Sequence, residues 1–73
     1  MAKENVISEI TGKVWKIEAE PGQKLAEEDA IIILESMKME IPVLAPVGGV
    51  LTEILVKEGD SVSEGQVLAV MES

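Results

Sequence analysis

The 73-residue chain carries 14 acidic residues against six lysines, and its formal net charge is −8. It has no cysteine and no histidine, which excludes disulfides, thiolate chemistry, and the commonest general base and metal ligand. A chain of this length is expected to form one small domain, residues 1–73, whose acidic surface disfavours binding to nucleic acid and to anionic membranes.

The beginning of the chain, Met1–Asn5, lacks the long apolar core of a signal peptide. The longest charge-free apolar stretch, residues 41–51, is interrupted by two prolines and two glycines. This pattern argues against a membrane-spanning segment. We therefore expect a soluble protein that works in the cytoplasm.

Short runs of β-branched and aliphatic residues follow, separated about every ten residues by glycine or proline. This rhythm predicts an all-β sandwich or barrel. Strands are expected in the segments 14–17, 30–34, 41–44 and 51–54. No run shows helical periodicity, and residues 26–29 are expected to form a single turn at most.

An internal repeat of 37 residues relates one half of the chain, about residues 6–36, to the other, about 43–73. Identical residues recur in one register without a gap: Gly12 and Gly49, Ile17 and Ile54, Gly22 and Gly59, Glu27 and Glu64. Two similar β units in so short a chain predict that the halves pack face to face about a pseudo-twofold axis.

The repeat also predicts local backbone features. The apolar residues that bound 14–17 and 51–54 are three positions apart, which indicates a β-bulge in each strand. Gly22 and Gly59 are expected in matching turns with positive φ. Trp15, the only aromatic residue, corresponds to a threonine in the second half and is expected to be half-exposed.

The repeat assigns a position to Lys38, because a shift of 37 places this residue on Met1. The turn that contains Lys38 therefore corresponds to the gap between the chain ends. We expect the two termini to meet at one end of the molecule and Lys38 to project from the other.

The link between the predicted strands 30–34 and 41–44 contains no glycine, asparagine or aspartate at its centre. Met37 and Lys38 are poor residues for a tight hairpin, and a broken local rule of this kind often marks a functional site. Met37 and Met39 would lie exposed beside the lysine, as in a partner-binding surface, or would pack on the end of the barrel.

The segment Glu35-Ser36-Met37-Lys38-Met39-Glu40 resembles the biotin attachment motif of biotinyl domains, in which a lysine lies between two methionines. The resemblance extends over roughly residues 6–72 and includes the Ala-Pro and Gly-Gly pairs after the hairpin. It implies a flattened β-barrel or sandwich of two four-stranded antiparallel sheets with internal pseudo-twofold symmetry.

The same resemblance implies a carrier and not an enzyme. A biotin protein ligase would attach biotin covalently to Lys38, and the cofactor would carry carboxylate between biotin carboxylase and carboxyltransferase sites. Met37 and Met39 would be flanking recognition residues. Glu35 and Glu40 would contribute to recognition by the ligase, or would simply be solvated strand ends.

One departure from related carriers is visible in residues 12–22, which run from glycine to glycine without an insertion. Carrier subunits of the acetyl-CoA carboxylase type often have an extra loop, the thumb, at this point. The chain therefore resembles thumbless biotinyl domains or a free-standing biotin/lipoyl attachment protein.

The sequence is also compatible with three alternatives to a biotin carrier. A lipoyl carrier would have lipoate on the same Lys38, although lipoyl domains usually have an acidic residue before the lysine and a small one after it. An unmodified β module could serve in assembly, with Lys38 incidental. An enzyme that uses Lys38 to form a Schiff base comes last, because the sequence offers no catalytic partner.

Overall fold

The computed structural model describes residues 2–73, so the expected match of Lys38 to Met1 lies partly outside the described residues. No helix in this part of the chain is long and apolar enough to cross a membrane. The described residues form eight β-strands: β1 (Lys3–Ile7), β2 (Gly12–Ile17), β3 (Lys24–Leu25), β4 (Ala30–Ser36), β5 (Met39–Leu44), β6 (Gly49–Ile54), β7 (Ser61–Val62) and β8 (Val67–Glu72).

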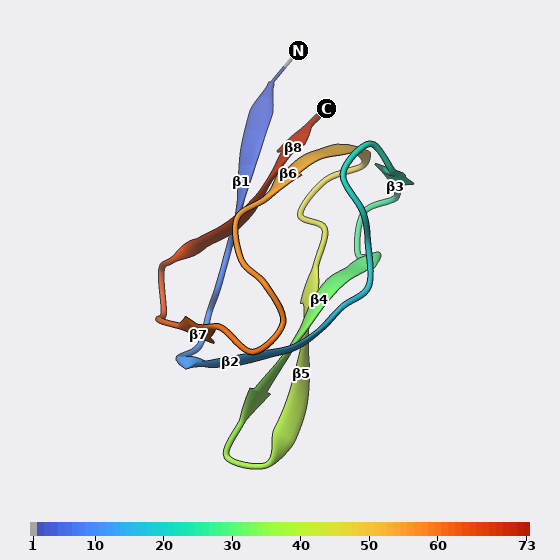
Figure 1. The fold of residues 1–73 in the computed structure, drawn as a ribbon. Helices are drawn as coiled ribbons and strands as arrows, with labels where there is room; N and C mark the ends of the chain where they lie inside the picture. Colours follow the sequence, from blue (N-terminus) through green and yellow to red (C-terminus); the bar gives the residue numbers. More distant parts are fainter. Residues whose placement is uncertain (1) are drawn as a thin grey trace.

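The strands make two four-stranded antiparallel sheets (Figure 1). Their orders are β1-β8-β6-β3 and β5-β4-β2-β7. A shift of 37 residues along the chain converts each strand of one sheet into the strand at the same place in the other. The predicted fold class, including its pseudo-twofold symmetry, is confirmed.

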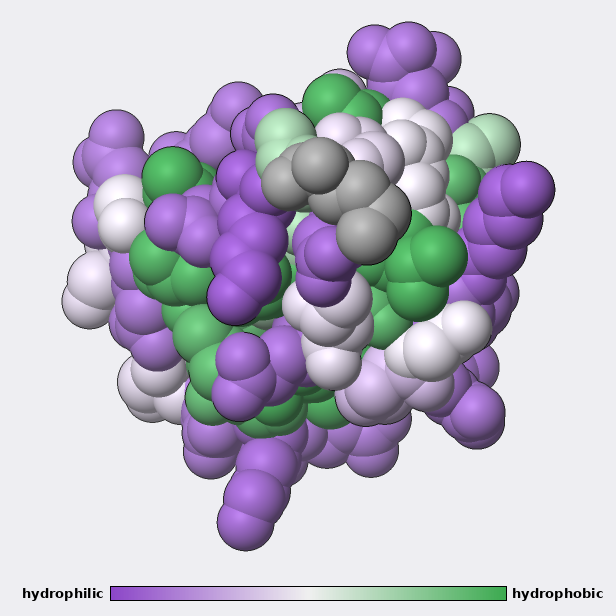
Figure 2. Space-filling model, turned by 90° about the horizontal axis from the view of Figure 1, so that it is seen from above, coloured by the Kyte–Doolittle hydropathy of each residue, from purple (hydrophilic) through white to green (hydrophobic). Residues whose placement is uncertain are grey.

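The core between the sheets consists largely of residues that the repeat relates to each other. Several such pairs are fully or almost fully buried: Val14 and Leu51, Leu25 and Val62, Ile31 and Leu68, Leu34 and Met71. Burial of an aliphatic side chain of this size contributes about 1.5–3 kcal/mol. Apolar surface also reaches solvent between hydrophilic side chains at the end of the molecule seen in Figure 2.

The two expected β-bulges are present. The register of β2 against β4 shifts at Trp15, and the register of β6 against β8 shifts at Thr52. The extra residue turns outward in both strands, and the Trp15 side chain is 49% exposed, as expected. Each bulge bends its strand so that the sheet can curve over the shared core.

Four β-turns with the same conformation and the same side-chain hydrogen bond connect the short strands β3 and β7 to their neighbours. In each turn the third residue has a positive φ, as in a type II turn: 91° at Gly22, 93° at Gly59, 86° at Gly65 and 75° at Glu28. The fourth residue accepts a hydrogen bond through its side chain from the first N–H: Gln23, Asp60, Gln66 and Asp29. The predictions for Gly22 and Gly59 are confirmed.

Glu28 departs from this pattern because it is not a glycine. It corresponds to Gly65 under the repeat, and a side chain in the left-handed region costs about 1–2 kcal/mol. The sequence interpretation missed this residue, although the repeat places it on a glycine position.

The two ends of the described part of the chain, Ala2 and Ser73, lie together, and the β4–β5 hairpin projects from the opposite end of the molecule (Figure 1). The N–H of Ser73 donates a hydrogen bond of 2.9 Å to the carbonyl of Ala2. The connection after β2, residues 18–23, is as short as its repeat mate after β6, residues 55–60. A thumb is therefore absent from the structure at this point.

Gly49 is required where β6 approaches β8. A Cβ at this position would collide with the backbone carbonyl of Glu72. We expect Gly49→Ala to lower the free energy of unfolding by about 1–3 kcal/mol, because backbone must shift to admit the methyl group. Urea denaturation followed by Trp15 fluorescence measures the change.

The neighbouring Gly48→Ala is the control, since the nearest atom to its Cβ would be the Leu25 carbonyl oxygen at 3.7 Å, an ordinary contact. Its effect is expected to stay below about 0.5 kcal/mol. Equal unfolding midpoints for the two variants would contradict the assigned contact.

Candidate functional site

The β4–β5 hairpin is longer than the sequence interpretation expected. Pairing continues past the predicted strand ends to Ser36 and Met39, which lie opposite each other. The loop therefore contains two residues only, Met37 and Lys38. This places Lys38 at the extreme tip of the hairpin.

The backbone at the tip is held in an unfavourable conformation. Met37 has a φ of 52° and Lys38 a φ of 65°, so that both central residues are left-handed, as a type I′ turn requires. For residues with a Cβ this costs about 1–2 kcal/mol each. The prediction that Met-Lys is poor turn chemistry agrees with this geometry, and the flanking β4–β5 ladder must supply the compensation.

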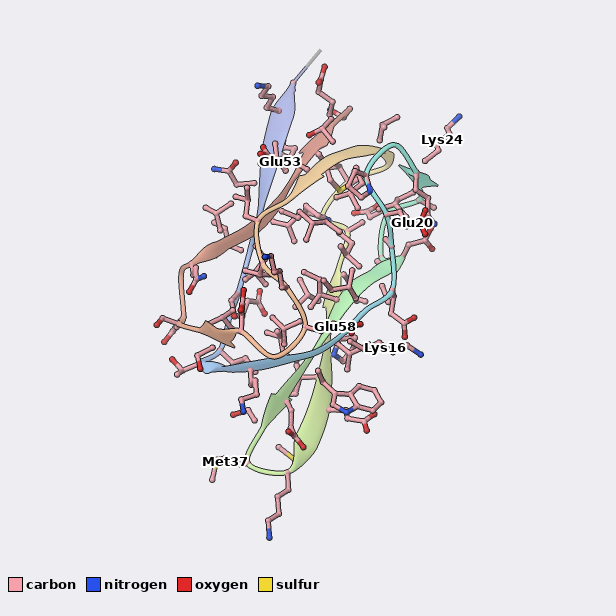
Figure 3. The ribbon with its side chains drawn as sticks, viewed as in Figure 1. Lys16, Glu20, Lys24, Met37, Glu53 and Glu58 are labelled. Carbon is pink, nitrogen blue, oxygen red and sulfur yellow. The ribbon has the colours of Figure 1, made fainter. Side chains whose placement is uncertain are left out.

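The side chains at the tip lie in solvent. Met37 is 90% exposed and Met39 is 59% exposed, so that most of each side chain is open to solvent. Lys38 between them is also exposed. Figure 3 shows Met37 at the end of the hairpin, directed away from the body of the protein. Two large apolar groups thus lie in water on either side of a free primary amine.

Charged residues form a row across the base of the tip. Glu35 of β4 lies directly opposite Glu40 of β5, and Lys13 of β2 lies opposite Glu35 on its other side. Like charges directly opposite each other destabilise a sheet, and Lys13 offsets part of this repulsion. The sequence interpretation missed Lys13, because the bulge at Trp15 sets which residue of β2 faces Glu35.

The hairpin is tied to the body just below the tip. The Ser36 hydroxyl donates a hydrogen bond of 3.1 Å to the carbonyl of Thr11, whose own hydroxyl accepts one of 3.2 Å from the Glu64 N–H. Gly12 allows this close approach, because a Cβ there would lie 2.6 Å from the Glu35 carbonyl oxygen. Pairing of β2 with β4 ends at Glu35, so the tip extends beyond its neighbouring strand.

The arrangement presents an exposed primary amine at the end of the hairpin. Among residues 2–73, no group of three or more His, Cys, Asp or Glu side chains could hold a metal ion. The structure brings all five residues singled out from the sequence into one hairpin end: Glu35, Met37, Lys38, Met39 and Glu40. Their functional roles stay predictions.

Comparison with known proteins agrees with this geometry. The model of the "Biotin-requiring enzyme" family, the biotin/lipoyl domain, matches residues 5–71. The biotin/lipoyl attachment protein of Bacillus subtilis is 43% identical over 60 residues, which cover 82% of each chain. The Mycobacterium leprae homologue of biotinylated protein TB7.3 is 40% identical over 68 residues, 93% of this chain and 96% of that one.

A solved structure extends the likeness to three dimensions. The crystal structure of the Kluyveromyces lactis urea carboxylase matches with a TM-score of 0.93 and 39% sequence identity. The match covers 99% of this chain but only 6% of the carboxylase chain. The similarity therefore concerns one small part of that large protein.

The strain at the tip can be measured by replacing the turn. The double substitution Met37→Asn with Lys38→Gly introduces the residues that a type I′ turn favours. We expect it to raise the free energy of unfolding by about 1–2 kcal/mol, measured by urea denaturation.

The control is Met37→Ala with Lys38→Ala, which removes both long side chains but keeps both Cβ atoms and hence the strain. This variant is expected to gain no comparable stability. If the two double variants unfold at the same urea concentration, the turn stores no strain that glycine relieves.

Proposed function

Because this chain belongs to the biotin/lipoyl attachment family, we propose that it is a biotin carboxyl carrier and that biotin is attached covalently to Lys38. The chain resembles the carrier part of biotin-dependent carboxylases and not a catalytic domain. The observation that carries the proposal is the position of Lys38. It is exposed in the two-residue loop of the hairpin, at the opposite end of the molecule from the hydrogen-bonded Ala2 and Ser73.

The tip of the hairpin is suited to the covalent attachment of a carboxylic acid such as biotin. Amide formation needs a primary amine that a ligase can enclose, and the two-residue loop presents Lys38 beyond its neighbouring strand. The biotin protein ligase would first activate the biotin carboxyl group; the Lys38 Nζ would then attack the carboxyl carbon, give up a proton and displace the activating group, which leaves an amide bond. Loss of the ammonium charge would take the formal net charge from −8 to −9.

When attached, biotin supplies the ring nitrogen that carries carboxylate between the biotin carboxylase and carboxyltransferase sites. The protein supplies reach and position. Lys38 adds its four-carbon side chain to a hairpin that already projects from the body. A tether of this kind keeps the transferred group at high effective concentration near both partner sites.

The flanking residues would identify the tip to the ligase. Met37 and Met39 offer apolar surface that a partner pocket can cover, since both are exposed. Glu35 and Glu40 lie opposite each other despite their like charges, and a basic surface on the ligase would relieve this repulsion. The ligase would thus recognise both apolar and acidic side chains close to the Lys38 amine.

A lipoyl carrier is the second candidate. The name of the B. subtilis relative includes both attachments, and lipoate would use the same Lys38. Against it, the lysine here is flanked on both sides by large apolar residues, Met37 and Met39. An unmodified assembly module would use the two exposed methionines to bind a partner, but it would leave Lys38 between them without a role.

Intact mass after co-expression with a biotin protein ligase tests the main proposal. We expect the chain to gain one biotinyl group, because a single amine lies at the tip of the hairpin. Lys38→Ala should abolish the gain, whereas Lys57→Ala, which removes an exposed lysine elsewhere, should keep it.

A lipoyl adduct after co-expression with a lipoyl ligase, without any biotinyl adduct, would favour the second candidate. Absence of an adduct with either ligase would reject both carrier functions and leave the assembly module.

The methionine flank can be tested separately. Met39→Ala is expected to slow biotinylation of Lys38 about tenfold, equivalent to about 1.4 kcal/mol of lost binding to the ligase, while the unfolding midpoint stays unchanged. The rate is measured with purified ligase at limiting concentration of the carrier.

Leu55→Ala is the matched control, because Leu55 is 50% exposed and Met39 59% exposed, but Leu55 lies outside the hairpin. Its rate should equal that of the unaltered protein. Equal rates for all three proteins would exclude a recognition role for Met39.

A further inference from the structure

A groove of about 670 Å³ lies between β1 and β5. These two strands are far apart in the sequence. Each of these strands is the outermost strand of its own sheet, and no ladder joins them. The floor and walls are mainly apolar: Val6, Ile7, Ile10, Leu34, Val43 and Leu44. Ile7 and Leu44, which the repeat relates to each other, are both more than 40% exposed although they are large and apolar.

The charges in the groove have one sign. Glu9, Glu27 and Glu28 are among its lining residues, and no lysine is. The whole chain carries a formal charge of −8, which opposes docking of a second copy in this groove and of any nucleic acid. Charge complementarity therefore favours an occupant that combines apolar and cationic groups.

Glu28 adds an independent observation. Its left-handed φ of 75° is costly for a residue with a side chain, and the equivalent turn in the other half uses Gly65. Gly65 does not line the groove, whereas Glu28 does. A turn of this type therefore forms without a side chain at its third position. The half of the chain that has a carboxylate at this position, Glu28, is the half whose turn lines the groove.

The backbone restricts how an occupant can bind. Pro42, in the middle of β5, has no N–H, so an added strand could not form a continuous ladder along this edge. An occupant must be held chiefly through its side chains. An extended or helical segment can meet this requirement if its apolar side chains enter the groove and its cationic side chains reach the carboxylates.

We propose that the β1–β5 groove docks a cationic amphipathic segment of a partner protein. The groove begins at Ile41, two residues along β5 from Met39, which is about 7 Å of extended chain. A partner bound there would lie beside the hairpin without covering its turn. The docking surface is independent of any group attached to Lys38.

The probe is a synthetic peptide of alternating leucine and lysine, titrated into the ¹⁵N-labelled protein. We expect amide shifts concentrated at the groove, including Ile7, Ile10 and Leu44. A peptide with glutamate in place of lysine, and one with serine in place of leucine, should bind at least tenfold more weakly. Binding should also weaken as salt is added, because the contacts to the carboxylates are screened.

Two variants with the same change in charge make the test specific. Glu27→Gln removes a carboxylate of the groove, whereas Glu64→Gln removes its repeat mate at the equivalent turn position outside the groove. Glu27→Gln is expected to weaken binding about threefold and Glu64→Gln to leave it unchanged.

Four results would overturn the proposal: no shifts, shifts spread over other acidic surfaces, equal binding of the three peptides, or equal weakening by both variants. Amide shifts at the groove that change with protein concentration in the absence of peptide would indicate that a second copy of the chain binds there. This result would also overturn the proposal. The Lys38→Ala variant should bind the peptide as the unaltered protein does. A failure of peptide binding can therefore be distinguished from a failure of the carrier function.

Discussion

The structure depends on one constraint, which is that neither half of the chain can bury its apolar residues alone. Each half contributes two strands to each sheet, so both sheets contain equal parts of the two repeats. The core consists accordingly of related pairs such as Leu34 and Met71. Because the β4–β5 link and the chain ends occupy equivalent places in this arrangement, they must lie at opposite ends of the molecule.

Unfavourable local features gather at the hairpin end. Met37 and Lys38 both have a left-handed backbone, and Glu35 faces Glu40 across the ladder. The long β4–β5 ladder and the hydrogen bond from Ser36 below the tip hold this segment in place. The backbone cost is thus concentrated where an exposed amine with a defined position is presented, which supports the proposal that Lys38 is the attachment site.

The sequence predicted the fold because its repeat relates residues that carry the same structural role. The bulges at Trp15 and Thr52 and the positive φ of Gly22 followed from apolar spacing and glycine placement. The left-handed Glu28 was missed, since a charged residue is not expected there. The groove was not predictable either, because β1 and β5 become neighbours only through the packing of the two sheets.

We propose that the position of the amine in the turn, and not the composition of the tip, defines the attachment site. The double substitution Met37→Lys with Lys38→Met tests this most directly, because it keeps composition, charge and the two-residue loop but moves the amine by one residue. Intact mass against time with purified biotin protein ligase should show modification at least tenfold slower than in the unaltered protein, with an unchanged unfolding midpoint. Modification at an equal rate would contradict the claim.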